Sequence, residues 1–274
     1  MDVHIKAPNV RDKLMDTLSF LPMKHSCEVV HWNGSKPGTF REQVSVRLPG
    51  GNSFWVGMAL NGVTTNWGHC RIEFNPNKVA TNEVFQEILL FLIENSRTPL
   101  RQVKRFDLAV DIPVERQRCF LVKDRRMYIE RRHGQEYTQY LGAKSSTVGR
   151  VKLYNKSIES CLEHPLTRLE LTLNPETTYA DIPWPTVYYI DTLDACFDGV
   201  KITDTERFIL TALLDGHGSL TDLGRKTRSK MELLMEKYLR SVDIAAEDYE
   251  TILRQLQTYV DGTALTIRSK ASAE

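Results

Sequence analysis

The sequence predicts an α+β fold, in which a mostly antiparallel sheet has one open polar face and helices on its other face, followed by a small helical C-terminal region. Two observations lead to this prediction. Short runs rich in β-branched and aromatic residues, separated by turn residues, fill the first two hundred positions. After about Lys201 the pattern becomes helical. We therefore expect two parts, residues 1–200 and residues 201–274.

The predicted strands of the first part are bounded by turn signals. The first four are SCEVVHWN (26–33), QVSVRLP (43–49), SFWVGMAL (53–60) and HCRIEFNP (69–76). Thr81 is the predicted N-cap of a helix that runs to about Asn95 and carries one apolar stripe. After it follow VKRFDLAVDIP (103–113), RRMYIERR (125–132), EYTQYLGAK (136–144), GRVKLYNKSIES (149–160) and TRLELTLNP (167–175). RIEFNPN at Arg71 and RLELTLNP at Arg168 resemble each other, which is consistent with a weak internal duplication.

Capping signals divide the C-terminal part into short helices. Thr203 with Glu206 forms a capping box, and Ser219 with Asp222 forms another cap after a glycine turn. Four basic residues open the next helix: Arg225, Lys226, Arg228 and Lys230. This order is compatible with a helix-turn-helix-like DNA reader. A plain helical bundle explains the pattern equally well.

Composition describes a globular protein and excludes several classes. The chain has 274 residues and a net charge of +1, and no apolar run is long enough to span a bilayer. Residues 1–8 lack the apolar core of a secretory signal, so we expect a cytoplasmic protein without a membrane partner. The five cysteines are widely spaced and form no CxxC pair, which predicts reduced thiols and argues against a zinc site.

The small net charge hides blocks of opposite sign. From Arg101 to Lys156 there are fourteen Lys and Arg against six Asp and Glu, whereas Ser157 to Glu206 holds two against ten. Such blocks are expected where a basic surface meets a polyanion. The candidate DNA-binding residues are Arg105, Lys144, Arg168 and the four basic residues that open the C-terminal helix. Uneven surface charge without a ligand is the simpler interpretation.

The stretch GRVKLYNKSIES places one tyrosine among cations. Side chains in a strand alternate between faces, so Val151 and Leu153 take the apolar face. The other face receives Arg150, Lys152, Tyr154 and Lys156. An ordinary half-buried strand with a solvated face shows the same pattern. The alternative is a face that meets phosphate.

Carboxylates gather on the same predicted face of two further strands. In RFDLAVD the alternation leaves Arg105, Asp107 and Asp111 on the open side, and in RLELTL it leaves Arg168 and Glu170 there. Clustered carboxylates repel one another unless a cation lies among them. Asp107, Asp111 and Glu170 are therefore candidate ligands of Mg²⁺ or Mn²⁺, which prefer oxygen donors. Ion pairs of these acids with the two arginines would need no metal, and both interpretations stay open.

A hard-metal site, a tyrosine and a basic face together indicate transesterification of a nucleic-acid phosphodiester. The tyrosine oxygen would attack phosphorus while the metal polarises a non-bridging oxygen. Arg150, Lys152 and Lys156 would stabilise the charge of the transition state and favour the phenolate of Tyr154. A hydrolytic nuclease needs only water and would not require the tyrosine.

Three segments resemble a known family in their order and spacing: VKRFDLAVDIP, YIERRHGQEYTQYLGAKSSTVGRVKLYNKSIES and TRLELTL. They are similar to the Rep_trans replication initiators of small rolling-circle plasmids of Gram-positive bacteria. The YLGAKSS turn with its basic-x-basic-x-Tyr-x-Lys strand is the most specific part, and RIEFNPNK also fits. The resemblance covers residues 40 to 175 well and the helical tail only in general character.

The resemblance implies a homodimeric initiator that binds the double-strand origin of its plasmid and nicks one strand in an extruded hairpin. Nicking would depend on a divalent cation, leave a 5′-phosphotyrosine and be followed by recruitment of a host superfamily 1 helicase. Residues 1–200 would then be the nicking and joining domain, and residues 201–274 the DNA-recognition region. Tyr154 would be the nucleophile, and Asp107, Asp111 and Glu170 fall where metal ligands are expected.

Several alternatives remain at this point. Tyr128, Tyr137 and Tyr140 are rival nucleophiles, and Glu73 is a further candidate ligand. The absence of a His-hydrophobe-His pair argues against other rolling-circle initiators and relaxases. A DNA-binding regulator of plasmid replication or copy number, without catalysis, would explain the charge blocks. A metal nuclease that activates water would use the same acids without Tyr154.

Overall fold

A computed structural model gives the structure of the chain. It describes residues 1–35, 39–60, 68–97, 101–133, 136–146, 148–189, 203–214, 218, 220–238 and 240–265. The chain divides into two compact units, residues Met1–Lys104 with Glu250–Glu274, and residues Arg105–Tyr249. The boundary that the sequence predicts between residues 200 and 201 falls within residues 190–202, which the structure does not describe. The α+β prediction is confirmed, with mostly antiparallel sheets in both units.

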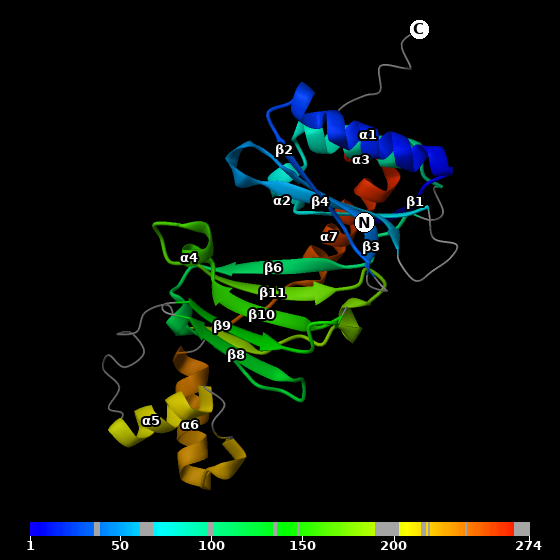
Figure 1. Cartoon of the computed structure of the whole chain (residues 1–274). Coiled ribbons are helices and arrows are strands. Elements are labelled where there is room, and N and C mark those ends of the chain that lie inside the picture. The colour runs from blue at the N-terminus through cyan, green and yellow to red at the C-terminus, as the bar shows by residue number, and fades with distance from the viewer. Residues whose placement is uncertain are drawn as a thin grey trace. The chain divides into compact units, whose positions relative to one another are not determined.

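Unit 1 is built on a five-stranded antiparallel sheet. Its strand order is β1-β5-β4-β3-β2, with bounds β1 Asp2–His4, β2 Glu28–Asn33, β3 Phe40–Arg47, β4 Ser53–Leu60 and β5 His69–Phe74. The apolar face of the sheet packs against α1 (Pro8–Lys24) and α3 (Glu83–Glu94), and α2 (Pro76–Val79) follows β5 (Figure 1). Fully buried core residues such as Leu18, Val56 and Ile88 come from both layers. Among the residues described, the helices α1, α2 and α3 all contribute side chains to this one core.

The predicted helix of unit 1 begins one residue later than expected. Asn82, and not Thr81, is the N-cap, because its side-chain oxygen accepts hydrogen bonds from the backbone N–H groups of Val84 and Phe85 at 3.0 and 3.3 Å. Either residue type can cap a helix, and the sequence pattern alone does not decide between neighbours.

The part of α7 that belongs to unit 1, from Glu250 onward, also packs against the core of this unit. There the Tyr259 ring packs against the Phe74 ring, with 5.2 Å between the ring centres.

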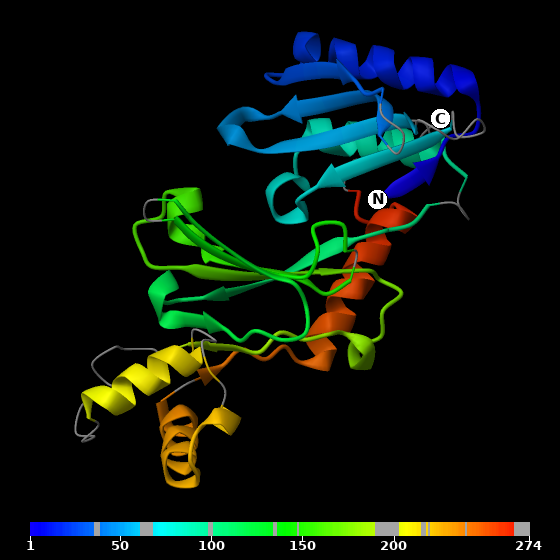
Figure 2. The ribbon, with the colours of Figure 1, turned by 60° about the horizontal axis from the view of Figure 1, so that its bottom comes forward.

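Unit 2 contains a second five-stranded antiparallel sheet (Figure 2). Its order is β6-β11-β10-β9-β8, with bounds β6 Phe106–Ile112, β8 Tyr128–His133, β9 Glu136–Leu141, β10 Arg150–Asn155 and β11 Thr167–Leu173. The helix α4 (Lys156–Ser160) follows β10 directly. Leu108, Leu169 and Leu171 are buried on the apolar face, whereas Asp107, Ala109 and Asp111 on β6 are exposed. The alternation predicted for β6 and β11 is therefore observed.

A small helical region closes unit 2. A three-stranded sheet joins β7 (Cys119–Leu121), β12 (Val187–Tyr189) and β13 (Arg240–Ser241), and the helices are α5 (Asp204–Leu214), α6 (Arg225–Tyr238) and the start of α7 (Ala246–Asp261). The predicted capping box is present, since the Thr203 N–H donates to Glu206 Oε2 at 2.8 Å and the Glu206 N–H donates to Thr203 Oγ1 at 3.3 Å. Ser219, predicted as the second cap, lies outside the described residues.

Two further expectations concern the whole chain. Within the described residues, no helix is both long and apolar enough to cross a membrane. Four cysteines are free thiols, as expected for a reduced protein: Cys27, Cys70, Cys119 and Cys161. Cys196 is not among the described residues.

Candidate active site around Tyr154

The strand β10 holds Tyr154 in the middle of the second sheet. Tyr154 lies opposite Arg168 on β11 and opposite Thr138 on β9. One pleat away on the same face, Lys152 lies opposite Glu170 and Tyr140. The face predicted from alternation thus brings the tyrosine, one lysine and one glutamate side by side. Because the strand is central, its position is fixed from both sides by backbone hydrogen bonds.

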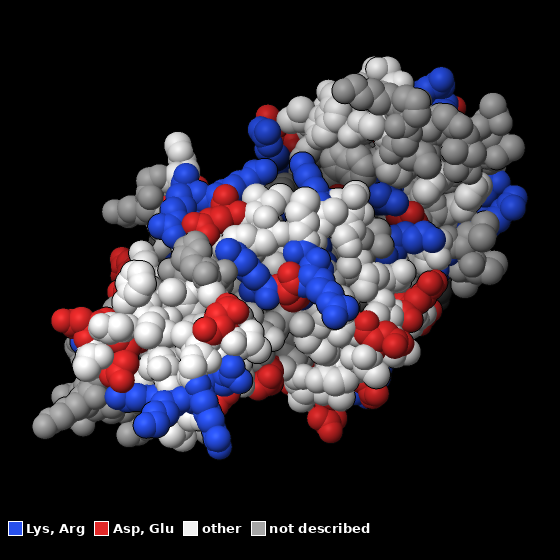
Figure 3. All heavy atoms as spheres, turned by 90° about the horizontal axis from the view of Figure 1, so that it is seen from below, with Lys and Arg blue, Asp and Glu red and all other residues white. Residues whose placement is uncertain are grey.

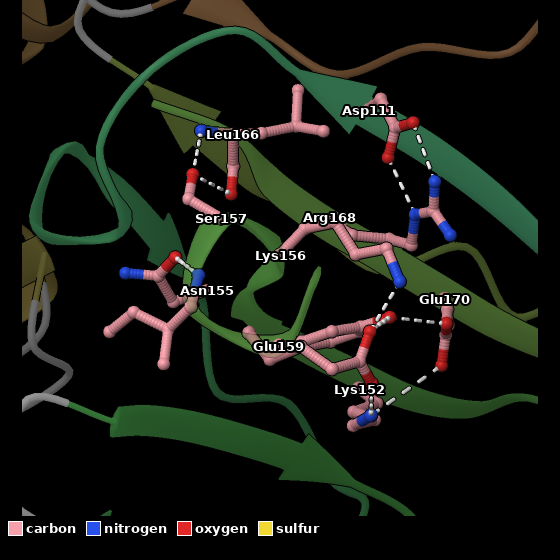
Figure 4. A network of polar contacts seen from close by, with 11 residues as sticks. Asp111, Lys152, Asn155, Lys156, Ser157, Glu159, Leu166, Arg168 and Glu170 are labelled. Carbon is pink, nitrogen blue, oxygen red and sulfur yellow. Dashed lines mark hydrogen bonds and ion pairs between the residues drawn. The ribbon is translucent and has the colours of Figure 1, made fainter. Parts of the chain in front are cut away.

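Two carboxylates contact the Tyr154 hydroxyl. It donates to Glu170 Oε1 at 2.7 Å, and Glu159 Oε2 lies 3.2 Å from the same oxygen. The Lys152 ammonium lies 3.5 Å from the centre of the tyrosine ring and within 4 Å of both glutamates. Only 4 % of Tyr154 is exposed. The tyrosine is therefore held in a small charged cluster and not displayed on an open surface. Figure 4 shows the Lys152, Glu159 and Glu170 side chains of this cluster.

The surroundings of Tyr154 keep its hydroxyl protonated. Burial raises the pKa of Tyr154, and the hydrogen bond to Glu170 and the charges of Glu170 and Glu159 raise it further. The expectation that the neighbouring cations favour the phenolate is wrong for this state, because burial and the two carboxylates in contact with the hydroxyl outweigh them and raise the pKa. A reaction at this oxygen therefore requires a group that removes its proton, and Glu170 is already in hydrogen-bond contact with it.

Lys156 reaches the cluster from a helix and not from the strand. It is the first residue of α4, where the Asn155 side chain caps the helix by accepting from the Ile158 N–H at 3.0 Å. Its ammonium hydrogen-bonds Glu159 Oε2 and lies 5.9 Å from the centre of the Tyr154 ring. The strand alternation predicted the correct side for Lys156, although the backbone had already turned into a helix.

Glu159 is the site residue that the sequence analysis missed. It lies on α4, three residues after Lys156, and one turn of helix directs both side chains to the same place. Burial alone would raise the pKa of Glu159, but the hydrogen bond from Lys156 and the charges of Lys156 and Lys152 hold that pKa below its usual value. The available signal was the capping residue Asn155, which ends the strand and predicts a helical turn behind it.

The two aspartates of β6 have partners of their own. Asp111 accepts two hydrogen bonds from the Arg168 guanidinium, at 2.6 and 2.7 Å, and this pair raises the pKa of Arg168. Asp107 accepts from the Thr172 hydroxyl at 2.7 Å. The cross-strand ion pair, which was one of the two interpretations of these acids, is therefore present for Asp111. Arg105 is exposed just before the strand.

The predicted ligand set of Asp107, Asp111 and Glu170 is not assembled in the structure. Among the residues described, no three His, Cys, Asp or Glu side chains are grouped as ligands of one ion. The pair that does converge is Glu170 with Glu159, on either side of the Tyr154 hydroxyl. Two carboxylates beside a phenol oxygen fit a hard divalent cation, whose remaining ligands are commonly water and phosphate oxygens. Glu73, the further candidate, belongs to unit 1.

The rival tyrosines lie in different surroundings. The Tyr128 hydroxyl donates to Glu130 at 2.9 Å, and the Tyr137 ring lies between the guanidinium groups of Arg116 and Arg132 at 4.3 and 4.5 Å. By strand alternation both belong to the opposite face of the sheet from Tyr154. Tyr140 shares the face of Tyr154, and Arg150 lies 5.5 Å from its ring centre. Among the described contacts, none of these three tyrosines both shares the face of Tyr154 and has its hydroxyl hydrogen-bonded to a carboxylate.

The predicted DNA-binding residues are of two kinds. Arg105, Lys144, Arg225 and Lys226 are exposed. By contrast, Arg228 donates to the carbonyls of Leu220, Thr221 and Leu223. Lys230 is exposed as well, but it pairs with Glu206 at 2.5 Å. On the face drawn in Figure 3, Lys and Arg side chains lie in several groups with Asp and Glu between them. The start of α6 therefore retains Arg225 and Lys226 as its accessible cations.

Comparison with known proteins adds no family assignment, because the chain matches no protein-family model and no curated protein. Function is therefore inferred from the residues around Tyr154. They combine a buried phenol, two carboxylates on its hydroxyl and two ammonium groups near its ring. The arrangement is suited to moving a proton from the phenol and to holding negative charge beside it.

Proposed function

We propose that this chain is a rolling-circle replication initiator of the Rep_trans type, which nicks and rejoins one DNA strand through Tyr154. The observation that carries the proposal is the 2.7 Å hydrogen bond from the Tyr154 hydroxyl to Glu170, with two lysine ammonium groups within 6 Å of the ring. A purely structural tyrosine needs one hydrogen-bond partner for its hydroxyl, and two carboxylates with two cations exceed that need. A nucleophile requires a base for its proton and cations for the phosphate that it attacks.

The proposed reaction transfers a phosphodiester from one alcohol to another. Glu170 takes the proton from Tyr154 Oη as this oxygen bonds to phosphorus, and the bond between phosphorus and the 3′ oxygen breaks. The departing 3′ oxygen takes up a proton from water, and Glu170 later returns its proton to water, which leaves a free 3′ hydroxyl and a 5′-phosphotyrosine. Lys152 and Lys156 lie where they can stabilise the additional negative charge on phosphorus. The reverse reaction, in which a 3′ hydroxyl attacks the phosphotyrosine, rejoins the strand.

A divalent cation is part of the proposal. Glu170 and Glu159 would hold it, with Asp107 and Asp111 farther along the face and engaged with Thr172 and Arg168. When bound, the cation would supply polarisation of a non-bridging phosphate oxygen. Both lysines lie within 4 Å of Glu159, so they neutralise the carboxylates when no cation does.

The test is a covalent adduct. We expect that the protein, incubated with Mn²⁺ or Mg²⁺ and a labelled single-stranded hairpin from a rolling-circle origin, yields a protein–DNA band on a denaturing gel. The band should disappear with chelator, since the reaction needs the cation. Origin binding that is equally tight with and without chelator, and without any adduct on a matched origin, would contradict the proposal. That result would favour the regulator that only binds DNA.

Origin recognition is assigned in this proposal to the region from residue 201 onward. Arg225 and Lys226 occupy the first turn of α6, where a recognition helix presents its contacts, and both are exposed. A homodimer and a host superfamily 1 helicase remain the expected partners. Both partners are proposed from the family resemblance alone.

Changing Arg225 or Lys226 to alanine is expected to weaken origin binding because each cation releases about one counterion on meeting a phosphate. The slope of log affinity against log salt should fall by about 1 for each substitution. Arg228→Ala is not a matched control, because that side chain holds the preceding turn. Lys24→Ala, an exposed cation on α1, is the control and should leave the slope unchanged. Equal slopes for all three variants would exclude the α6 contact.

A further inference from the structure

The sheets of the two units have the same topology. In chain order the strands of unit 1 are arranged 1-5-4-3-2, and the five main strands of unit 2 have the same arrangement, all antiparallel. The two strands with similar sequences, β5 with Arg71 and Glu73, and β11 with Arg168 and Glu170, are both second from the edge. The similarity noted in the sequence therefore corresponds to equivalent places in two sheets.

The same ion pair occupies the same register in both sheets. Arg71 lies opposite Asp2 on β1, and its Nε and Nη2 donate to the aspartate at 2.6 and 3.0 Å. Arg168 lies opposite Asp111 on β6, with corresponding distances of 2.6 and 2.7 Å. Equal strand order could arise by convergence. Equal strand order with the same bidentate pair at the same cross-strand position indicates a repeat.

Because the two sheets correspond strand by strand, the residue of unit 1 that is equivalent to Tyr154 can be named. Opposite Arg168 stands Tyr154, and opposite Arg71 stands Gly57. A Cβ atom on Gly57 would lie 2.2 Å from the Trp55 ring and 2.7 Å from Phe40, so these rings already fill the place above the glycine. Trp55 in turn occupies the position of Lys152. Unit 1 thus retains the arginine, aspartate and glutamate but has aromatic rings in place of the nucleophile and its lysine.

The aromatic character continues toward the edge of the same face. Trp32 on β2 lies opposite Gln43 on β3, which lies opposite Gly57 on β4. Trp32 is therefore in the same cross-strand row as Gly57 and Arg71. Its side chain is 42 % exposed, which is unusual for so large an apolar ring, and Trp55 is half-buried. Two basic residues of β3 are exposed: Arg47, which alternation from Gln43 places on this face, and Arg41, two residues before Gln43. Arg47 pairs with Glu28, whereas Arg41 makes no ion pair within the described part of the chain.

From this repeat we infer that the polar face of unit 1 binds single-stranded DNA without cutting it. Exposed rings on an open sheet, with arginines between them, are the means by which proteins stack bases and hold the backbone of single strands. Trp32 and Trp55 would carry the bases, and Arg41 and Arg47 the phosphates. The kind of ligand is taken from the proposed function, while the surface is argued from unit 1 itself.

The test measures binding of fluorescent oligothymidylate, which contains no origin, by anisotropy. All proteins carry Tyr154→Phe, so that no adduct can contribute. Trp32→Ala is expected to bind roughly 5- to 100-fold more weakly, as is usual for loss of one stacking ring. Arg41→Ala should weaken binding and reduce the salt slope by about 1. Phe20→Ala removes a ring that is 54 % exposed on α1 of the same unit and should bind like the parent.

Equal affinity of the Trp32 and Phe20 variants would overturn the inference. The experiment is independent of catalysis, because loss of binding on Trp32→Ala supports the surface even if wild-type protein never forms an adduct. Conversely, an adduct that depends on Tyr154 can coexist with a negative result here. Circular dichroism of both variants checks that the exposed substitutions leave the fold intact.

Discussion

Replacing Tyr154 with phenylalanine is expected to abolish the covalent protein–DNA adduct entirely. The substitution removes the attacking oxygen and nothing else of the ring, which stays beneath the Lys152 ammonium 3.5 Å from its centre. The strand remains paired on both sides. The lost hydrogen bond to Glu170 costs about 1 kcal/mol of folding free energy or somewhat more, too little to unfold a domain of this size. Denaturing gels of labelled hairpin with each protein measure the adduct.

Tyr128→Phe is the matched control. The Tyr128 hydroxyl also donates to a glutamate, Glu130, at 2.9 Å, but on the opposite face of the same sheet. Its loss removes this contact and the hydrogen bond that the hydroxyl accepts from Gln139 at 2.6 Å, without touching the candidate site, so this variant should form the adduct at the wild-type rate. Cleavage that survives in Tyr154→Phe would transfer the reaction to water, as in a metal nuclease. An adduct that survives there would point to Tyr140, which shares the face.

Strand alternation predicted most of the face around Tyr154. Period-two patterns in RFDLAVD, GRVKLYN and RLELTL predicted that Asp111, Arg168 and Glu170 lie on one face. The register puts Asp111 and Arg168 in the cross-strand row of Tyr154, and Glu170 in the neighbouring row with Lys152. The signal is strong because one face of these strands is buried against apolar segments, which fixes the orientation of every side chain. The fold class followed from the same patterns and is confirmed.

The same local patterns could not predict which groups meet. Glu159 joins the tyrosine because α4 turns back over the end of β10, and the hydrogen-bond partner of Asp111 depends on the register of β6 with β11. Register is set by long-range pairing, which a single segment does not contain. No strand was predicted at β1, so Asp2 was not expected as the partner of Arg71. Without that pair, the repeat stayed a similarity between two short segments.

The burial of Tyr154 has a consequence for the mechanism. With 4 % of the residue exposed, the proposed attack on a phosphodiester would require side chains in contact with Tyr154, among them Lys152 and Glu159, to move aside. Lys152 and Lys156 each form an ion pair with Glu159, and an incoming phosphate would replace both pairs by its own contacts with the lysines. The ion pairs with Glu159 therefore neutralise the two lysines in the free protein, and the same lysines would neutralise a bound phosphate.

Glu170→Gln is expected to slow adduct formation by about 10²- to 10⁴-fold, the usual contribution of a general base. The amide oxygen still accepts the hydrogen bond from Tyr154, so the geometry at 2.7 Å is largely kept, but it cannot take the proton. Single-turnover rates on the labelled hairpin measure the effect. Glu130→Gln, at the equivalent contact of Tyr128 on the other face, should react like wild type. Equal rates for the two variants would place the base elsewhere.

The pH dependence of Glu170→Gln separates a lost base from a lost contact. In the wild-type protein, burial and the two carboxylates hold the pKa of Tyr154 above its ordinary value. Removing one negative charge lowers that pKa, so a larger fraction of phenolate exists at any pH below it. Since the variant must react through this phenolate, its rate should rise about tenfold per pH unit until the pKa is reached. Wild type, which passes the proton to Glu170, should show a much flatter profile over the same alkaline range. A variant that is slow but equally flat would mean that Glu170 only positions the tyrosine.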